Sequence, residues 1–298
     1  MAARNHAPFV ADAVASVLEQ DYEPLELVAI DDASDDETAD ILEDCAAAAP
    51  RGRMIVVRHE RQEGIGATRA HALGLAGGDF IGLLDSDDLW LAGKVRPQVE
   101  LLAAEPTAGL THAAFEAFNS ETGEAVPWEP KWNLEDDELV ELVRRGCFVM
   151  TGTALIRRAA MDTRGIGFVT LDYPSYDDYL LYLTIALDWR FAYEPRTVMR
   201  YRRHQGNLTN VLFADNLARA RFNLLVEFLQ RFPEARARLG AERRRTLARL
   251  LVRAAIYDRT RDPARAVGSA MSALAQHPVA ALDEITGVLR NRLSTSAV

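Results

Sequence analysis

The first half of the chain alternates between amphipathic stretches and short apolar runs. Apolar residues recur at helical spacing from Val10 to Leu18, which predicts a helix that ends near Gln20. The same pattern predicts helices over 37–49, 67–76 and 94–104, with buried strands over 25–30, 54–57 and 80–84. Because strands and helices alternate, we expect an α/β fold: a mostly parallel sheet flanked by helices on both faces.

The pattern changes in the second half. Further strands are predicted over 109–118, 149–156 and 191–201, and a helix with an acidic first turn lies within 174–189. From about Asp215 onward, apolar residues gather on single helical faces, and prolines mark helix starts or breaks. We therefore expect a domain of residues 1–210, followed by a C-terminal helical appendage of about four helices over 211–298.

The composition limits the classes of partner. The 298 residues are 49% hydrophobic and 26% charged, as in a soluble protein with a sizeable core. The net charge of -10 argues against nucleic acid, and it means that a phosphate-bearing ligand needs a cation or a local arginine. The two cysteines make no disulfide framework, so we expect a cytoplasmic protein. Peripheral association with the inner face of the membrane stays open.

Two of the predicted strands end in carboxylate clusters. Asp31 and Asp32 follow the first, and Asp85-Ser-Asp87-Asp88 follows the third. Ligands of parallel α/β sheets bind beyond the carboxyl ends of the strands. In extended chain, residues two apart point the same way, so Asp85 and Asp87 would form an oxygen site for Mg²⁺ or Mn²⁺. Such a cation stabilises charge on a departing diphosphate. The alternative reading is a solvated acidic loop that caps a helix.

Four segments resemble motifs of the inverting family 2 glycosyltransferases, in the family's order and spacing. They are Asp31-Asp-Ala-Ser-Asp-Asp36, Gly64 through Trp90, Tyr176-Asp-Asp-Tyr-Leu-Leu-Tyr-Leu183 and Tyr201-Arg-Arg-His204. Together they cover roughly residues 1–210. The resemblance implies a GT-A fold, a divalent cation and a nucleotide-sugar donor, usually a UDP-sugar. It also implies a carbohydrate or glycoconjugate acceptor, as in surface polysaccharide synthesis.

The resemblance also assigns roles to single residues. Asp32 matches the position that contacts the nucleotide base. Asp87 and Asp88 match the diphosphate and metal positions, and Asp85 opens that motif as a further metal ligand. Arg69 matches a basic residue near the diphosphate.

Asp178 matches the catalytic base, which takes the proton from the acceptor hydroxyl as it attacks. Without the resemblance, N-capping explains the pair Asp177-Asp178 equally well, because a helix start favours ionised carboxylates. His204 matches a residue that contacts the diphosphate or the metal in some relatives, and a surface or core histidine is the alternative. Acceptor contacts are expected within 110–175, where Trp128, Trp132 and Tyr173 are candidates for stacking on a sugar.

The chain departs from the family at its start. Relatives carry an apolar strand before a turn like Met1–Asn5, so we expect either a start upstream of Met1 or a domain without its first strand. The short start favours a second hypothesis, a catalytically inactive nucleotide-sugar-binding or scaffold protein. The intact Asp87, Asp88 and Asp178 argue against it. A phosphoryl-transfer enzyme would instead need a first-strand aspartate and a downstream lysine.

Overall fold

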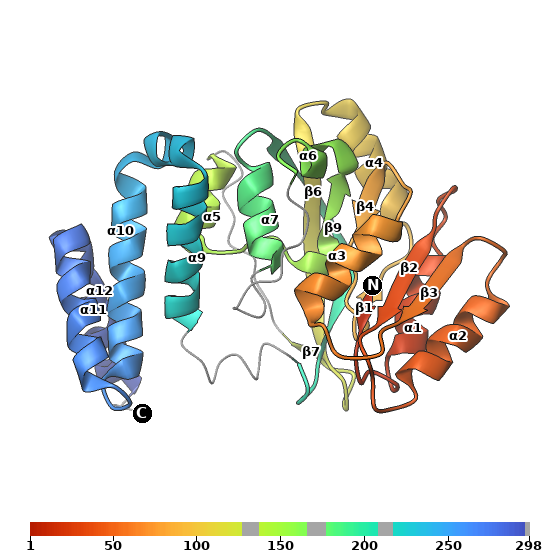
Figure 1. The fold of residues 1–298 in the computed structure, drawn as a ribbon, viewed down its shortest axis with the longest axis horizontal. Helices are drawn as coiled ribbons and strands as arrows, with labels where there is room; N and C mark the ends of the chain where they lie inside the picture. Colours follow the sequence, from red (N-terminus) through yellow and green to blue (C-terminus); the bar gives the residue numbers. More distant parts are fainter. Residues whose placement is uncertain (127–136, 166–176, 208–216, 296–298) are drawn as a thin grey trace. The chain divides into compact units, whose positions relative to one another are not determined.

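A computed structural model describes residues 1–126, 137–165, 177–207 and 217–295 (Figure 1). The chain divides into two compact units. The first comprises Met1–Glu138 and Cys147–Asn207, and the second comprises Leu139–Gly146 and Leu208–Val298. The predicted boundary at 210/211 lies outside the described residues. Most of helix α5 (Glu138–Arg145), which the sequence placed in the first domain, belongs to the second unit.

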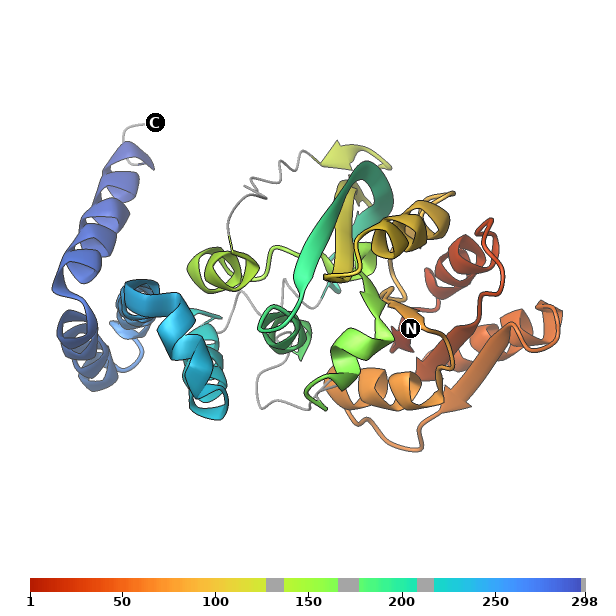
Figure 2. The same ribbon diagram turned by 90° about the horizontal axis from the view of Figure 1, so that it is seen from above.

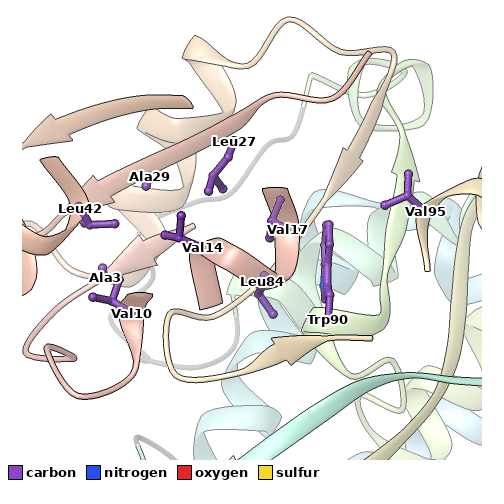
Figure 3. Packing of buried hydrophobic residues seen from close by; sticks show 10 residues of the cluster. All are labelled: Ala3, Val10, Val14, Val17, Leu27, Ala29, Leu42, Leu84, Trp90 and Val95. Atoms are coloured by element: carbon purple, nitrogen blue, oxygen red, sulfur yellow. The ribbon is translucent and has the colours of Figure 1, made fainter. Parts of the chain in front are cut away.

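The first unit begins with a parallel three-stranded sheet. Its order is β1 (Ala2–Ala3), β2 (Leu27–Asp31) and β3 (Met54–Arg58). Alternate residues of β2 face opposite layers, as strand geometry requires. Leu27 and Ala29 pack with helices α1 (Val10–Leu18) and α2 (Thr38–Ala48), in the cluster of Figure 3. Val28 and Ile30 pack with Ala72 of α3 (Ile65–Leu75). Helices therefore cover both faces, as predicted.

The first strand is short but present. Ala2 pairs with Ile30 and Ala3 with Asp31, and the Met1 amine donates to the Val28 carbonyl at 2.7 Å. The expectation that the domain lacks this strand is corrected: two residues of it belong to the sheet. A cavity of about 710 Å³ lies beside it, lined by residues of β2 and β4 (Phe80–Gly82). Arg69 and Trp90 line this cavity, whereas Asp87 and His204 do not.

A second sheet completes the first unit and positions the site. Its strands, in order, are β4, β8 (Leu155–Arg157), β6 (Ala108–Asn119), β9 (Arg190–Arg203) and β5 (Leu89–Trp90), with β7 (Ala125–Val126) beside β6. Only the β6–β9 pair is parallel among its described strands, so this sheet is mixed rather than mostly parallel. Helix α4 (Val95–Ala104) lies against it (Figure 2). Helices α6 (Arg158–Asp162) and α7 (Asp177–Ile185) follow later in the chain.

Residues 149–154 differ from the strand that the sequence predicted. They contain the 3₁₀ turn η1 (Thr151–Thr153), because the N–H and the hydroxyl of Thr153 both donate to the Met150 carbonyl, at 2.9 and 2.8 Å. The strand itself is confined to β8. This turn becomes part of the candidate site.

The described tail of the second unit is helical, as expected, with four helical segments, the second of which kinks at Gly240 (φ 50°) and so comprises two helices. The four segments are α9 (Leu217–Arg231), α10 (Pro233–Asp258), α11 (Pro263–Gln276) and α12 (Pro278–Thr295). Three of them begin with proline, whose fixed φ suits the first helical turn. Ala248, Leu251 and Val252 of α10 pack with alanines of α11 and α12 in a core of their own. Within the described ranges, none of the helices is long and apolar enough to cross a membrane.

Candidate functional site

The acidic loop, residues 85–88, joins β4 to β5. β4 ends at Gly82, and the Asp88 N–H donates to the Asp85 carbonyl at 3.1 Å, so the loop turns. The premise that extended chain points Asp85 and Asp87 the same way is therefore wrong. The Asp85 carboxylate pairs with Arg69, whereas that of Asp87 faces His204.

Asp87 lies against two histidines. Its Oδ2 is 3.0 Å from His204 Nε2 and 3.9 Å from His6 Nε2, while His6 Nδ1 is 2.7 Å from the Ser86 hydroxyl. Burial alone would raise the pKa of Asp87, but the His204 hydrogen bond and the two histidine charges lower it below its ordinary value. The candidate ligand atoms of His6, Asp87 and His204 lie within 4.8 Å of one another. This donor set is suited to a divalent cation.

The segment after β2 holds the loop that carries His6. The backbone N–H groups of residues 5–7 donate, in order, to Ser34 (3.0 Å), Thr38 (2.8 Å) and Asp36 (3.1 Å). Three consecutive donors are thereby satisfied by side chains of one short segment. Ser34, Asp36 and Thr38 thus fix the backbone from which His6 reaches Asp87.

Asp88 is buried, with 1% of its surface exposed. It accepts a hydrogen bond from the Arg202 backbone N–H at 2.9 Å, and the Arg202 side chain donates to the Asp87 carbonyl at 2.8 Å. Burial, followed by the charges of Asp87 and Asp85, raises the pKa of Asp88 well above its ordinary value. Asp88 therefore anchors β9 to the acidic loop, and this burial leaves little of it for a ligand.

Arg69 joins the acidic loop to helix α7. Its guanidinium lies 2.5 Å from Asp85 Oδ1 and 2.9 Å from Asp177 Oδ2, with 9% of the side chain exposed. Charge-assisted bonds of this kind are strong and directional. Arg69 therefore fixes the separation between the loop and the first turn of α7. Its contact with a diphosphate stays a prediction.

Asp178 follows in the same turn of α7. It accepts a hydrogen bond from the Thr151 hydroxyl at 2.7 Å. Burial raises the pKa of Asp178 to about 6, the Asp177 charge adds to the rise, and Arg69 and Thr151 oppose it. A carboxylate with this pKa is suited to accept a proton near neutral pH.

Asp32 lies directly after β2 and is occupied by protein donors. It accepts hydrogen bonds from the N–H groups of Glu63 (2.8 Å) and Gly64 (2.9 Å), and it lies 2.9 Å from His59 Nδ1. Burial would raise its pKa, but these hydrogen bonds lower it. Asp32 thus positions the start of α3 and is not part of the His6–Asp87–His204 group. Its contact with a nucleotide base stays a prediction.

The family follows from comparison with known proteins. A family model for glycosyl transferase family 2 matches residues 1–165, more than half of the chain. This chain is a family 2 glycosyltransferase. It is 32% identical over 217 residues to the Escherichia coli UDP-Glc:alpha-D-GlcNAc-diphosphoundecaprenol beta-1,3-glucosyltransferase WfaP, covering 70% of this chain and 78% of WfaP. It is 40% identical over 95 residues to the Rhizobium meliloti succinoglycan biosynthesis protein ExoU, covering 32% of this chain and 27% of ExoU.

Solved structures confirm the GT-A fold of this glycosyltransferase. S. aureus TarS 1-349 in complex with UDP-GlcNAc superposes with a TM-score of 0.60 at 17% identity, covering 96% of this chain and 90% of that one. The Pyrobaculum calidifontis mannosyltransferase PcManGT, in complex with GDP-Man and Mn2+, superposes with a TM-score of 0.57 at 20% identity, covering 95% and 81%. At these identities the likeness shows the fold alone.

Two residues of the candidate site were not predicted from the sequence. His6 directly follows the turn Met1–Asn5, and only its place beside a family motif could have suggested a role. Thr151 lay in a stretch predicted as strand, where no pattern marks its hydroxyl. The stacking candidates Trp128, Trp132 and Tyr173 lie outside the described residues, as does Tyr176 of the family motif.

Proposed function

We propose that this glycosyltransferase transfers a sugar, with inversion and with the help of a divalent cation, from a UDP-sugar to an acceptor hydroxyl. One observation carries the proposal. Asp87 of the acidic loop lies close enough to His6 and His204 for all three to share one cation, and the same loop is tied through Asp85 and Arg69 to the turn that bears Asp178.

His6, Asp87 and His204 would hold the cation. Two imidazole nitrogens beside one carboxylate favour Mn²⁺ over Mg²⁺, which prefers oxygen ligands and keeps several waters. When bound, the cation supplies positive charge to the departing diphosphate. In an acidic protein of net charge -10, such a charge, like that of a local arginine, would offset the repulsion of a polyphosphate. PcManGT, which shares the fold, is solved with GDP-Man and Mn2+, and this is consistent with the use of a cation. Asp85, predicted as a ligand, is assigned to Arg69 instead.

Asp178 is proposed as the base. An inverting transfer needs one carboxylate to take the proton of the acceptor hydroxyl as that oxygen attacks the sugar carbon. Asp178 as a residue is only partly buried, and Thr151 holds one of its carboxylate oxygens. The neighbouring Asp177 is committed to Arg69, so Asp178 is the carboxylate of this pair that remains for the acceptor.

The donor and the acceptor class are proposed from the relatives. WfaP is named for transfer from UDP-Glc to a diphosphoundecaprenol-linked GlcNAc, and TarS is solved with UDP-GlcNAc. By analogy, we assign to this chain a UDP-sugar and a carbohydrate acceptor of surface polysaccharide synthesis. A lipid-linked acceptor would place the reaction at the cytoplasmic face of the membrane.

A panel of nucleotide sugars tests the proposal. Release of the nucleoside diphosphate is measured for the purified enzyme in Mn²⁺, in Mg²⁺ and in EDTA. We expect one or more UDP-sugars to be hydrolysed in Mn²⁺, and the rate to collapse in EDTA. Equal rates of hydrolysis in Mn²⁺ and in EDTA would show that the reaction needs no divalent cation. Tight binding without hydrolysis or transfer would instead support the inactive binding protein.

A further inference from the structure

Side chains from one short segment bind three successive carbonyls of the Thr151 turn, which we define as residues 151–154. Trp90 Nε1 donates to the carbonyl of residue 152 at 2.8 Å, and Gln98 Nε2 donates to that of residue 153 at 2.9 Å. Lys94 Nζ donates to the carbonyl of residue 154 at 3.5 Å. Trp90, Lys94 and Gln98, named here the carbonyl clamp, belong to β5 and to the start of α4.

The carbonyl clamp is buried. Lys94 is 1% exposed and Gln98 is fully buried. Lys94 Nζ also donates to Gln98 Oε1 at 2.7 Å and lies 4.3 Å from the centroid of the Trp90 ring. Burial lowers the pKa of Lys94 to about 7, and among the described residues no carboxylate charge opposes this shift. Burying a charged ammonium without a carboxylate partner costs free energy of folding. Apolar side chains could pack against a turn without that cost.

The opposite side of the Thr151 turn meets the site. The Thr151 hydroxyl donates to Asp178 at 2.7 Å. A Cβ on Gly152 would lie 2.5 Å from Met199 Sδ, so the turn is also packed closely against β9. The carbonyl clamp begins two residues after the acidic loop, at Trp90. It therefore links the cation side of the site to the residue that orients Asp178.

We propose that Trp90, Lys94 and Gln98 are positioning residues for sugar transfer. By fixing the carbonyls of the Thr151 turn, they keep the Thr151 hydroxyl on Asp178 and aim that carboxylate at the acceptor. The inference rests on the proposed role of Asp178 as the base. Its physical basis is that a displacement of about 1 Å at a reacting group can cost about 10²-fold in rate.

A double-mutant cycle tests the inference. Trp90→Phe keeps the ring but removes the indole donor, and Thr151→Val keeps the shape but removes the hydroxyl. We expect each to lower kcat about tenfold, with the KM for the UDP-sugar within about twofold of wild type. The double variant should lose no more than the worse single variant, because both changes act through one hydrogen bond to Asp178. Thr151→Ser should restore kcat.

Trp189→Phe is the matched control, since it removes an indole hydrogen bond to the Thr163 hydroxyl (3.1 Å) and should leave kcat unchanged. Losses that multiply in the double variant, or a raised KM with normal kcat, would overturn the inference. If Trp90→Phe does not fold, as judged by its thermal melt, Lys94→Met takes its place in the cycle with the same expectation. Failure of the proposed function looks different, because Asp178→Asn would then retain wild-type turnover.

Discussion

At the scale of single residues, the three carboxylates of the acidic loop have three different partners. Asp85 pairs with Arg69, Asp87 lies against His204 and His6, and Asp88 accepts from the β9 backbone. Neighbouring like charges raise one another's pKa, so separate partners let the loop keep several carboxylates in a small volume. Of the three, only Asp87 lies with two histidines in the proposed cation site.

Asp87→Ala should remove the carboxylate ligand of the proposed cation. We expect Mn²⁺-dependent binding of UDP to weaken at least about 100-fold, because even residues behind the ligands cost about 10- to 100-fold when lost. Titration calorimetry of UDP in Mn²⁺ measures this. Asp44→Ala, an exposed carboxylate on α2, is the control and should bind as wild type. If Asp87→Ala binds UDP in Mn²⁺ as tightly as the wild type does, Asp87 does not bind the cation.

Asp178→Asn should keep donor binding and lose about 10²- to 10⁴-fold in turnover, because the amide cannot accept the acceptor's proton. In the wild-type enzyme, burial raises the pKa of Asp178 to about 6, so the reactive ionised form prevails above that pH. Turnover should therefore be constant above about pH 7 and fall about tenfold per pH unit well below pH 6. A flat profile down to pH 5 would assign the base to another residue.

At the scale of secondary-structure elements, β4 leaves room for the Trp90 ring. A Cβ on Gly82 would lie 2.6 Å from Trp90 Cη2. We expect Gly82→Ala to lower the free energy of unfolding by about 1–3 kcal/mol, the usual cost of overpacking. Gly74→Ala is the matched control. Its Cβ would meet no atom within 4 Å inside α3, and it should be stabilising by about 0.5–1 kcal/mol. Equal melting temperatures for the two variants would contradict the packing.

Elements with a strong period were predictable from the sequence. The helix expected from Val10 runs to Leu18, and the first predicted strand overlaps β2, because burial on one or two faces sets these periods. The Thr151 turn was not predictable. The side chains that bind its carbonyls belong to residues more than 50 positions earlier. A pattern within residues 149–156 cannot predict contacts over that distance.

The same limit applied to the site. Runs of family-like residues located Asp87, Asp178 and His204, but only the fold shows which of them meet. His204 and Asp87 are 117 residues apart in sequence, and His6 is a single residue without a pattern of its own. Burial of Asp88 and the pairing of Asp85 with Arg69 also depend on segments distant in the sequence. The sequence alone therefore could not predict the different environments of the loop's aspartates.

At the scale of the whole molecule, the second unit has a hydrophobic core that does not include the candidate site. Leu251 is 4% exposed in that core. Leu251→Ala should cost about 2–5 kcal/mol of unfolding free energy, as deletions of buried leucine do. Circular dichroism melts measure the loss, and UDP binding at 25 °C should be unchanged. A loss of UDP affinity in a folded variant would show that this core supports the donor site.

The hold of Ser34, Asp36 and Thr38 on residues 5–7 bears on how ion selectivity would change in this enzyme. These three side chains fix the backbone that carries His6, and so they influence the distance between its imidazole and Asp87 in the proposed cation site. Redesign toward a larger or smaller metal would therefore begin in a segment whose side chains need not touch the metal at all.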